Sequence, residues 1–139
     1  MTFVLDASIA AGWFLPDEEN EAAESLIRAL AAGPALVPSL FWFEIRNLFV
    51  IAERRGRLNP GAALAMTLRL RALPLTDGGT GNDVSIVNLS LRHGLSAYDA
   101  SYVELARSSG MPLATSDRKM AAVARAEGIS IVGPLEHER

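Results

Sequence analysis

Apolar residues recur along the chain in two patterns: short unbroken runs, and longer segments with an apolar residue at every third or fourth position. The short runs predict buried strands, and the longer segments predict helices with one face toward a core. The expected strands cover residues 2–5, 35–38, 73–75, 111–117 and 129–133. One helix is expected to start directly after the first strand, and the others to cover residues 17–33, 39–57, 59–73, 81–94, 94–106 and 117–128.

This alternation of short strands and helices predicts an α/β domain in which a parallel sheet is covered on both faces. The chain of 139 residues is long enough for one domain with a substantial core and too short for two ordinary ones. It contains no linker, internal repeat or low-complexity segment, so we expect a single domain over residues 1–139.

The amino-acid composition excludes several kinds of active site. The chain has no cysteine, which excludes thiolate nucleophiles and cysteine-based zinc sites, and its two histidines are far apart in the sequence. No P-loop motif is present. No apolar run approaches the roughly 18 residues of a membrane span, and the N-terminus lacks a basic segment, so we expect a cytoplasmic protein. Any catalysis must therefore use mainly carboxylates and hydroxyls.

One carboxylate stands on a helix face that should be apolar. In the segment GLSAYDASYVELA, Asp99 shares a face with Tyr102, Val103 and Ala106, which follow it by three, four and seven positions. Ser96 stands where the N-cap of this helix is expected. An acid on the core side of a helix needs a partner or a cation.

Three further acids hold comparable positions. Asp6 directly follows the first strand, and Asp117 follows the fourth, so both are expected at the edge of the sheet where ligands bind in parallel α/β folds. Glu44 lies at the border of the apolar stripe of its helix, a stripe expected to consist of Phe41, Ile45, Leu48 and Ala52.

Each acid also has a purely structural explanation. Asp6 and Asp117 could cap helices, and Asp99 could complete a capping box that begins at Ser96. Glu44 could be a partly buried acid paired with Arg46.

A divalent metal site explains all four acids at once. Carboxylates within about 4–6 Å of one another repel, and a hard cation such as Mg²⁺ removes that penalty. Such a site orients water and shields charge that develops on a phosphoryl group. The hydroxyls of Ser8, Thr115 and Ser116 could hydrogen-bond the ligating acids, although helix capping and turn formation explain these hydroxyls equally well.

Four segments together resemble the PIN domain, and most closely the VapC-like toxins of bacterial and archaeal toxin–antitoxin pairs. They read VLDASIAAGWF, FWFEIRNLF, HGLSAYDASYVELA and PLATSDRKMAAVARAEGI, and the resemblance extends in order over nearly the whole chain. The LSAYDA and LATSD segments are the specific part of the match, whereas LDAS alone would be weak.

The resemblance implies a three-layer sandwich with a central five-stranded parallel sheet, in a flavodoxin-like arrangement. It also implies a metal-dependent endoribonuclease, the toxin of a type II toxin–antitoxin system, which cuts structured RNA such as tRNA or rRNA. Asp6, Glu44, Asp99 and Asp117 match the acids with which the family binds Mg²⁺ or Mn²⁺, and Ser8 or Thr115 matches a supporting residue. Family members usually form homodimers and are silenced by an antitoxin that enters the active-site groove.

RNA binding requires positive charge, although the net charge of the chain is −3. The candidate RNA contacts are Arg46, the cluster Arg54, Arg55 and Arg57, and the pair Arg118 and Lys119. A phosphate contact is favoured for Arg118 and Lys119, because they stand at a helix N-terminus, where the helix dipole disfavours cations. Arg54, Arg55 and Arg57 are explained slightly better as favourable charges at a helix C-terminus. In the helix over 59–73, Leu64 and Leu68 point away from Met66 and Leu70, which predicts contact with a second subunit or an antitoxin.

Two alternatives to a nuclease remain open. A phosphatase or receiver domain on a similar sheet would require an acidic motif after the first strand that differs from Asp6-Ala7-Ser8. A non-catalytic PIN-like module that only binds RNA or a partner would not need four acids, but fold alone does not establish activity.

Overall fold

The computed structural model describes residues 2–16 and 20–138. The described residues form five strands, namely β1 (Val4–Leu5), β2 (Ala35–Val37), β3 (Leu75–Asp77), β4 (Leu113–Ala114) and β5 (Ile131–Val132). They also form seven α-helices, namely α1 (Ala7–Phe14), α2 (Glu21–Ala29), α3 (Leu40–Arg54), α4 (Ala62–Arg71), α5 (Asp83–His93), α6 (Ala97–Ser109) and α7 (Arg118–Ala126). A short 3₁₀ helix, Leu30–Ala32, extends α2.

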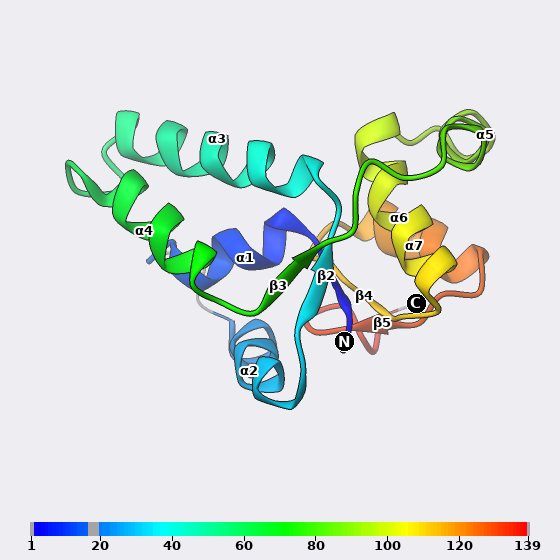
Figure 1. Cartoon of the computed structure of the whole chain (residues 1–139), viewed down its shortest axis with the longest axis horizontal. Helices are drawn as coiled ribbons and strands as arrows, with labels where there is room; N and C mark the ends of the chain where they lie inside the picture. The colour runs from blue at the N-terminus through cyan, green and yellow to red at the C-terminus, as the bar shows by residue number, and fades with distance from the viewer. Residues whose placement is uncertain (1, 17–19, 139) are drawn as a thin grey trace.

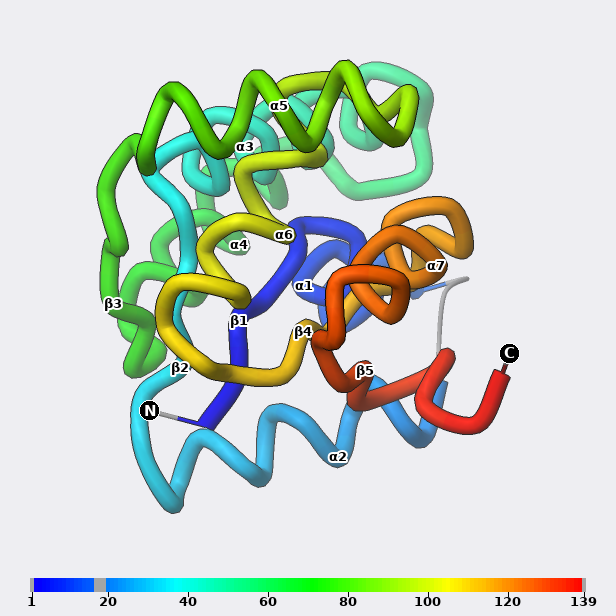
Figure 2. The backbone as a smooth tube through the Cα atoms, turned by 90° about the vertical axis from the view of Figure 1, so that its right-hand side faces the viewer, coloured from blue at the N-terminus to red at the C-terminus, as the bar shows by residue number. Residues whose placement is uncertain are grey.

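All strand pairs are parallel, and the order across the sheet is β3-β2-β1-β4-β5. Helices α1 to α4 lie on one side of the sheet, and α5 to α7 lie on the other (Figure 1). Figure 2 looks onto the second of these layers, in which α6 crosses in front of the central strands. The expected three-layer α/β sandwich with five parallel strands is confirmed. Its strand order places the switch point between β1 and β4, whereas flavodoxin itself has the order 2-1-3-4-5.

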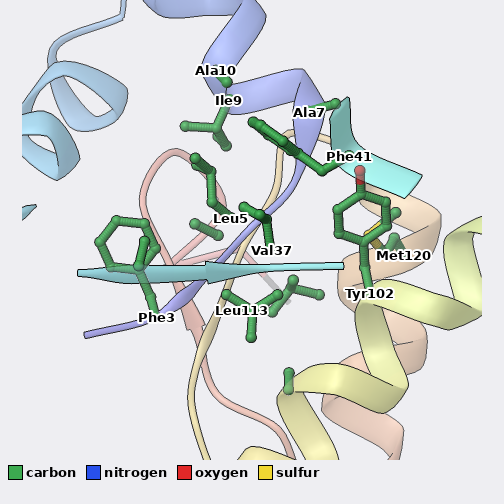
Figure 3. Close-up of a cluster of buried hydrophobic side chains, with 14 of the residues drawn as sticks. Phe3, Leu5, Ala7, Ile9, Ala10, Val37, Phe41, Tyr102, Leu113 and Met120 are labelled. Atoms are coloured by element: carbon green, nitrogen blue, oxygen red, sulfur yellow. The ribbon is translucent and has the colours of Figure 1, made fainter. Parts of the chain in front are cut away.

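The central strands are buried on both faces because helices cover both faces of the sheet. Val4, Val37 and Leu113 are each fully inaccessible to solvent. Figure 3 shows how Phe41 from α3 and Tyr102 from α6 meet at one end of this core. The core therefore joins the two helical layers at the edge of the sheet where β1 and β4 end.

The long helix α3 departs from its expected pattern in two details. Phe49 is fully buried, whereas Leu48 is 38% exposed, so the expected stripe through Leu48 is wrong at that position. The apolar face of α3 turns toward Phe14, whose ring meets Phe49 edge-on at 5.7 Å. Ser39 holds the N-cap position as expected, but its hydroxyl donates to Asp77 at 2.7 Å instead of capping the helix.

The other elements follow their expected positions with shifted ends. The expected helix over 17–33 begins outside the described residues, and α2 starts at Glu21 after Asn20, whose side chain accepts the Ala23 amide at 3.0 Å. The third strand lies two residues later than expected, at Leu75–Asp77. In the described part of the chain, no helix combines the length and the hydrophobicity needed to cross a membrane.

Candidate metal and active site

Asp6 lies in the centre of the sheet edge and is 94% buried, with 6% of its surface exposed. The hydroxyls of Ser8 and Thr115 both donate to its Oδ2 atom, each at 2.7 Å. Thr115 reaches Asp6 because Leu5 pairs with Ala114 in the parallel register of β1 and β4. Asp6 holds the N-cap position of α1 but makes no side-chain capping bond, so the capping explanation for this residue is wrong.

Burial raises the pKa of the Asp6 carboxyl to about 6, from an ordinary value of 3.8. The hydrogen bonds from Ser8 and Thr115 act in the opposite direction, because they stabilise the ionised form. The negative charges of Glu44 and Asp99 also contribute to the raised value. Asp6 is therefore a buried acid with two other carboxylates near enough to disfavour its ionisation.

Asp99 reaches the same region from the first turn of α6. The Ser96 hydroxyl accepts the Asp99 amide at 3.0 Å, which confirms Ser96 as the N-cap. Burial raises the pKa of the Asp99 carboxyl, the negative charge of Asp117 adds to this effect, and a hydrogen bond with Ser96 opposes it. Asp99 thus takes part in the helix cap and also faces the other acids.

Glu44 comes from the opposite helical layer, on α3. Its Oε1 atom accepts a hydrogen bond of 2.6 Å from the hydroxyl of Tyr102, which is fully buried on α6. Burial raises the pKa of Glu44, the Tyr102 hydrogen bond lowers it, and the charge of Asp99 raises it. The expected pairing of Glu44 with Arg46 is wrong: the Arg46 guanidinium lies over the Phe43 ring, 4.9 Å from its centroid.

Asp117 follows β4 and caps α7. Its Oδ1 atom accepts the Met120 amide at 3.0 Å, so the capping explanation is correct for this residue. The Asp117 amide donates to the Thr115 hydroxyl at 3.0 Å, and the Ser116 amide donates to the Ser8 hydroxyl at 3.1 Å. The Ser8 and Thr115 hydroxyls therefore connect Asp6 to the loop that carries Asp117.

The four acids line one pocket with a volume of about 730 Å³. One wall is a single face of α3, formed by residues spaced three or four positions apart, and the facing wall comes from α1. Arg55 and Arg57, just beyond the end of α3, also line the pocket. The α3 wall consists of Glu44, Leu48, Ile51 and Ala52, the α1 wall includes Ser8 and Gly12, and Arg55 and Leu15 line the pocket directly after the ends of these helices.

The pocket also explains why Leu48 is exposed. Leu48 follows Glu44 by one helical turn and lines the pocket beside it, and the fully buried position is taken by Phe49. The same face of α3 that presents Glu44 therefore forms an apolar wall leading toward Arg55.

The sequence matches the family model of the PIN domain over residues 3–126. The chain belongs to the PIN-domain family. This confirms the family resemblance expected from the sequence. The strand β5 lies beyond the matched region, and it completes the sheet of this PIN domain by pairing with β4.

Two similar proteins come from the archaeon Pyrobaculum aerophilum. Ribonuclease VapC3 is 34% identical to this PIN domain over 126 residues, which cover 87% of this chain and 93% of that protein. The crystal structure of PAE2754 superposes with a TM-score of 0.68 at 26% sequence identity, over 88% of this chain and 79% of that one. Both matches extend over most of the PIN domain.

The donor set of this PIN domain suits a hard divalent cation. Four carboxylates surround one pocket, and oxygen ligands are those preferred by Mg²⁺ and Mn²⁺. Among residues 2–16 and 20–138, no group of three or more Asp, Glu or His side chains is already gathered at coordination spacing. Mg²⁺ is usually held by one or two carboxylates and completes its shell with water, so a wider arrangement of acids fits it.

The basic residues favoured as RNA contacts lie outside the pocket lining. The Arg118 guanidinium donates two hydrogen bonds to the Glu138 carboxylate, at 2.8 and 3.1 Å. Lys119 donates to the Gly94 carbonyl at 2.6 Å. The sequence pattern predicts only a packing role for Tyr102 and gives no signal for its hydroxyl at the site. Arg55, for which the helix-end explanation is slightly favoured from the sequence, lines the pocket.

Proposed function

We propose that this PIN domain is a metal-dependent endoribonuclease and acts as the toxin of a type II toxin–antitoxin system. The observation that carries the proposal is the convergence of Asp6, Glu44, Asp99 and Asp117 on one pocket, with the pKa values of the first three raised. Burial is the largest cause of these raised values, and neighbouring negative charges add to it, so a cation bound among the acids would stabilise their ionised forms. The similarity to a protein named Ribonuclease VapC3 supports the same reaction.

In this proposal the four acids hold Mg²⁺ or Mn²⁺. When bound, a divalent ion acidifies water for attack on a phosphodiester and neutralises the charge that develops on the phosphoryl group. Ser8 and Thr115 engage one oxygen of Asp6, and the Met120 amide engages one oxygen of Asp117. Each of these carboxylates can then turn its second oxygen toward a cation.

Arg55 and Arg57 supply the positive charge that an RNA backbone requires at the pocket itself. Arg55 follows Glu44 by eleven residues, which corresponds to about 16 Å along the axis of α3. A strand of RNA cut at the acids would therefore extend along α3 and meet Arg55 away from the scissile phosphate. Arg46, Arg118 and Lys119 remain proposed contacts for more distant phosphates, with structured RNA such as tRNA or rRNA as the substrate.

In this proposal residues 1–139 act as one domain in the cytoplasm. The proposed partners are a cognate antitoxin and a second copy of the chain. Two exposed apolar surfaces support the presence of protein partners. Val84, Val87 and Leu91 lie on one face of α5 and are 70%, 50% and 79% exposed. We assign this face to the homodimer. Leu64 and Leu68 on α4 are 66% and 60% exposed, and we assign them to the antitoxin.

Incubation of the purified chain, free of bound antitoxin, with total cellular RNA tests the proposal. Cleavage into discrete fragments is expected with Mg²⁺ or Mn²⁺, and EDTA should abolish it. Sequencing of the fragment ends would identify the target. Folded protein that leaves all RNA intact at every metal concentration would overturn the nuclease proposal in favour of a PIN-like module that only binds RNA or a partner.

A further inference from the structure

The hydrogen bond between Tyr102 and Glu44 joins the two helical layers at the pocket. Glu44 belongs to α3 on one side of the sheet, and Tyr102 belongs to α6 on the other, 58 positions later in the sequence. The bond length of 2.6 Å is typical of a hydroxyl that donates to an ionised carboxylate. The ring of Tyr102 is fully buried, so its position is set by the core.

Tyr102 also shares a helix face with a second acid of the pocket. It follows Asp99 by three positions on α6, which places the two residues on the same side of the helix. Figure 3 shows the oxygen of Tyr102 directed toward the part of the core where Ala7 and Phe41 lie, close to the start of α1. One turn of α6 therefore carries both Asp99 and the Tyr102 hydroxyl, which donates a hydrogen bond to Glu44.

We propose that Tyr102 is a positioning residue that fixes the orientation of Glu44 for cation binding. A phenol has a single proton, and here it is donated to Oε1, so the other oxygen of Glu44 is left to face the pocket. Glu44 is only half-buried, and nothing else among its described contacts is a hydrogen-bond donor to its carboxylate. Without the phenol, the Glu44 side chain would exchange among rotamers that point into solvent.

This inference rests on the proposed metal site and adds the residue that organises one of its ligands. Groups that hydrogen-bond a metal ligand commonly change the metal affinity by about 10- to 100-fold when they are removed. The packing contribution of Tyr102 is separate, because its ring fills the core independently of the hydroxyl. Removal of the oxygen atom alone keeps this packing and removes the bond to Glu44, together with the interaction of the hydroxyl with the Ala7 backbone. The double variant described below separates these two effects.

The test is calorimetric titration of Mn²⁺ into the full chain and four variants: Tyr102→Phe, Glu44→Gln, the double variant and Tyr98→Phe. Tyr102→Phe should weaken Mn²⁺ binding about tenfold. Tyr98→Phe removes the same atom from a residue that is 67% exposed, and it should bind Mn²⁺ as the wild type does. Circular dichroism and thermal unfolding should show that all variants are folded.

The double variant decides whether Tyr102 acts through Glu44. In the Glu44→Gln background, the Tyr102→Phe change should cause little further loss, because the carboxylate that it positions is gone. Equal Mn²⁺ affinity of Tyr102→Phe and wild type would overturn the inference, as would an equal loss in both backgrounds. A wild-type chain that binds no Mn²⁺ would overturn the proposed metal site together with it, so the two failures are distinguishable.

Discussion

The hydroxyl of Thr115 donates a hydrogen bond of 2.7 Å to Oδ2 of Asp6, although the two residues are 109 positions apart in the sequence. The same hydroxyl accepts the amide of Asp117 at 3.0 Å. Thr115 is fully buried, so both bonds are shielded from water. One side chain therefore holds two acids of the pocket in fixed relation, and the parallel pairing of β1 with β4 brings them together.

Replacement of Thr115 by Val should destabilise the protein by about 1–3 kcal/mol, because the buried partners of the hydroxyl lose a hydrogen bond while the volume is kept. It should also weaken Mn²⁺ binding about tenfold or more. Urea unfolding and calorimetric titration measure the two effects. Thr115→Ser keeps the hydroxyl and should retain most of the metal affinity, whereas equal affinities of all three proteins would contradict this role.

The raised pKa of Asp6 predicts a pH-dependent stability in the absence of metal. The folded state binds this proton more tightly than the unfolded state does, so the stabilising contribution of this group is complete below about pH 4 and is lost as the pH rises to about 6. The fall attributable to this group is about 3 kcal/mol at most. The Asp6→Asn variant should show a smaller fall, as measured by urea unfolding with EDTA from pH 4 to 8.

Asp83→Asn is the matched control for this measurement, because Asp83 is an exposed acid at the start of α5, away from the pocket. It should reproduce the pH-dependent fall of the wild type. If Asp6→Asn lost as much stability between pH 4 and 6 as the wild type, the ionisation of Asp6 would not be the cause.

Arg55→Ala should weaken RNA binding and reduce its salt dependence. Loss of one phosphate contact lowers the slope of log affinity against log salt by about 0.7 for single-stranded RNA. Fluorescence anisotropy with labelled RNA, in an Asp99→Asn background that is expected not to cleave the RNA, measures both quantities. Arg28→Ala removes an exposed charge from α2 and should have no comparable effect. If Arg55→Ala binds RNA with the affinity and salt dependence of the protein that retains Arg55, the RNA does not contact Arg55.

If the proposed homodimer forms through α5, Leu91→Asp should convert it to a monomer, because it places a charge on the most exposed apolar residue of the α5 face. Light scattering coupled to gel filtration measures the mass directly. Leu68→Asp makes the same change on α4 and should leave the dimer intact while weakening antitoxin binding. A dimer that persists in Leu91→Asp would show that α5 is not the interface.

The layer arrangement and the sites of the four acids could be predicted because they depend on local patterns. Unbroken apolar runs define buried strands, and an acid directly after a parallel strand must lie at its carboxyl edge. Asp99 was identified by a conflict between its charge and its helix face, which is also a local signal.

The remaining features depend on contacts between distant segments. The stripe of α3 passes through Phe49 and not Leu48, because Phe14 packs there and the pocket opens beside Leu48. The apolar character of Tyr102 suited a packing role, and its hydroxyl could be assigned only once α3 and α6 were placed on opposite sides of the sheet. The position of Arg55 at the pocket likewise follows from where α1 faces α3.

The central claim is that the acids of this pocket form a metal-dependent ribonuclease. Its most direct measurement is the cleavage rate of a target RNA by wild type, Asp99→Asn and the control Asp83→Asn, each with Mn²⁺ or EDTA. Cleavage by wild type and Asp83→Asn should require Mn²⁺, and Asp99→Asn should be slower by at least about 100-fold, since removal of a proposed metal ligand would disable the chemistry that the ion supplies. Cleavage that persists in EDTA, or an Asp99→Asn variant as active as wild type, would contradict this claim.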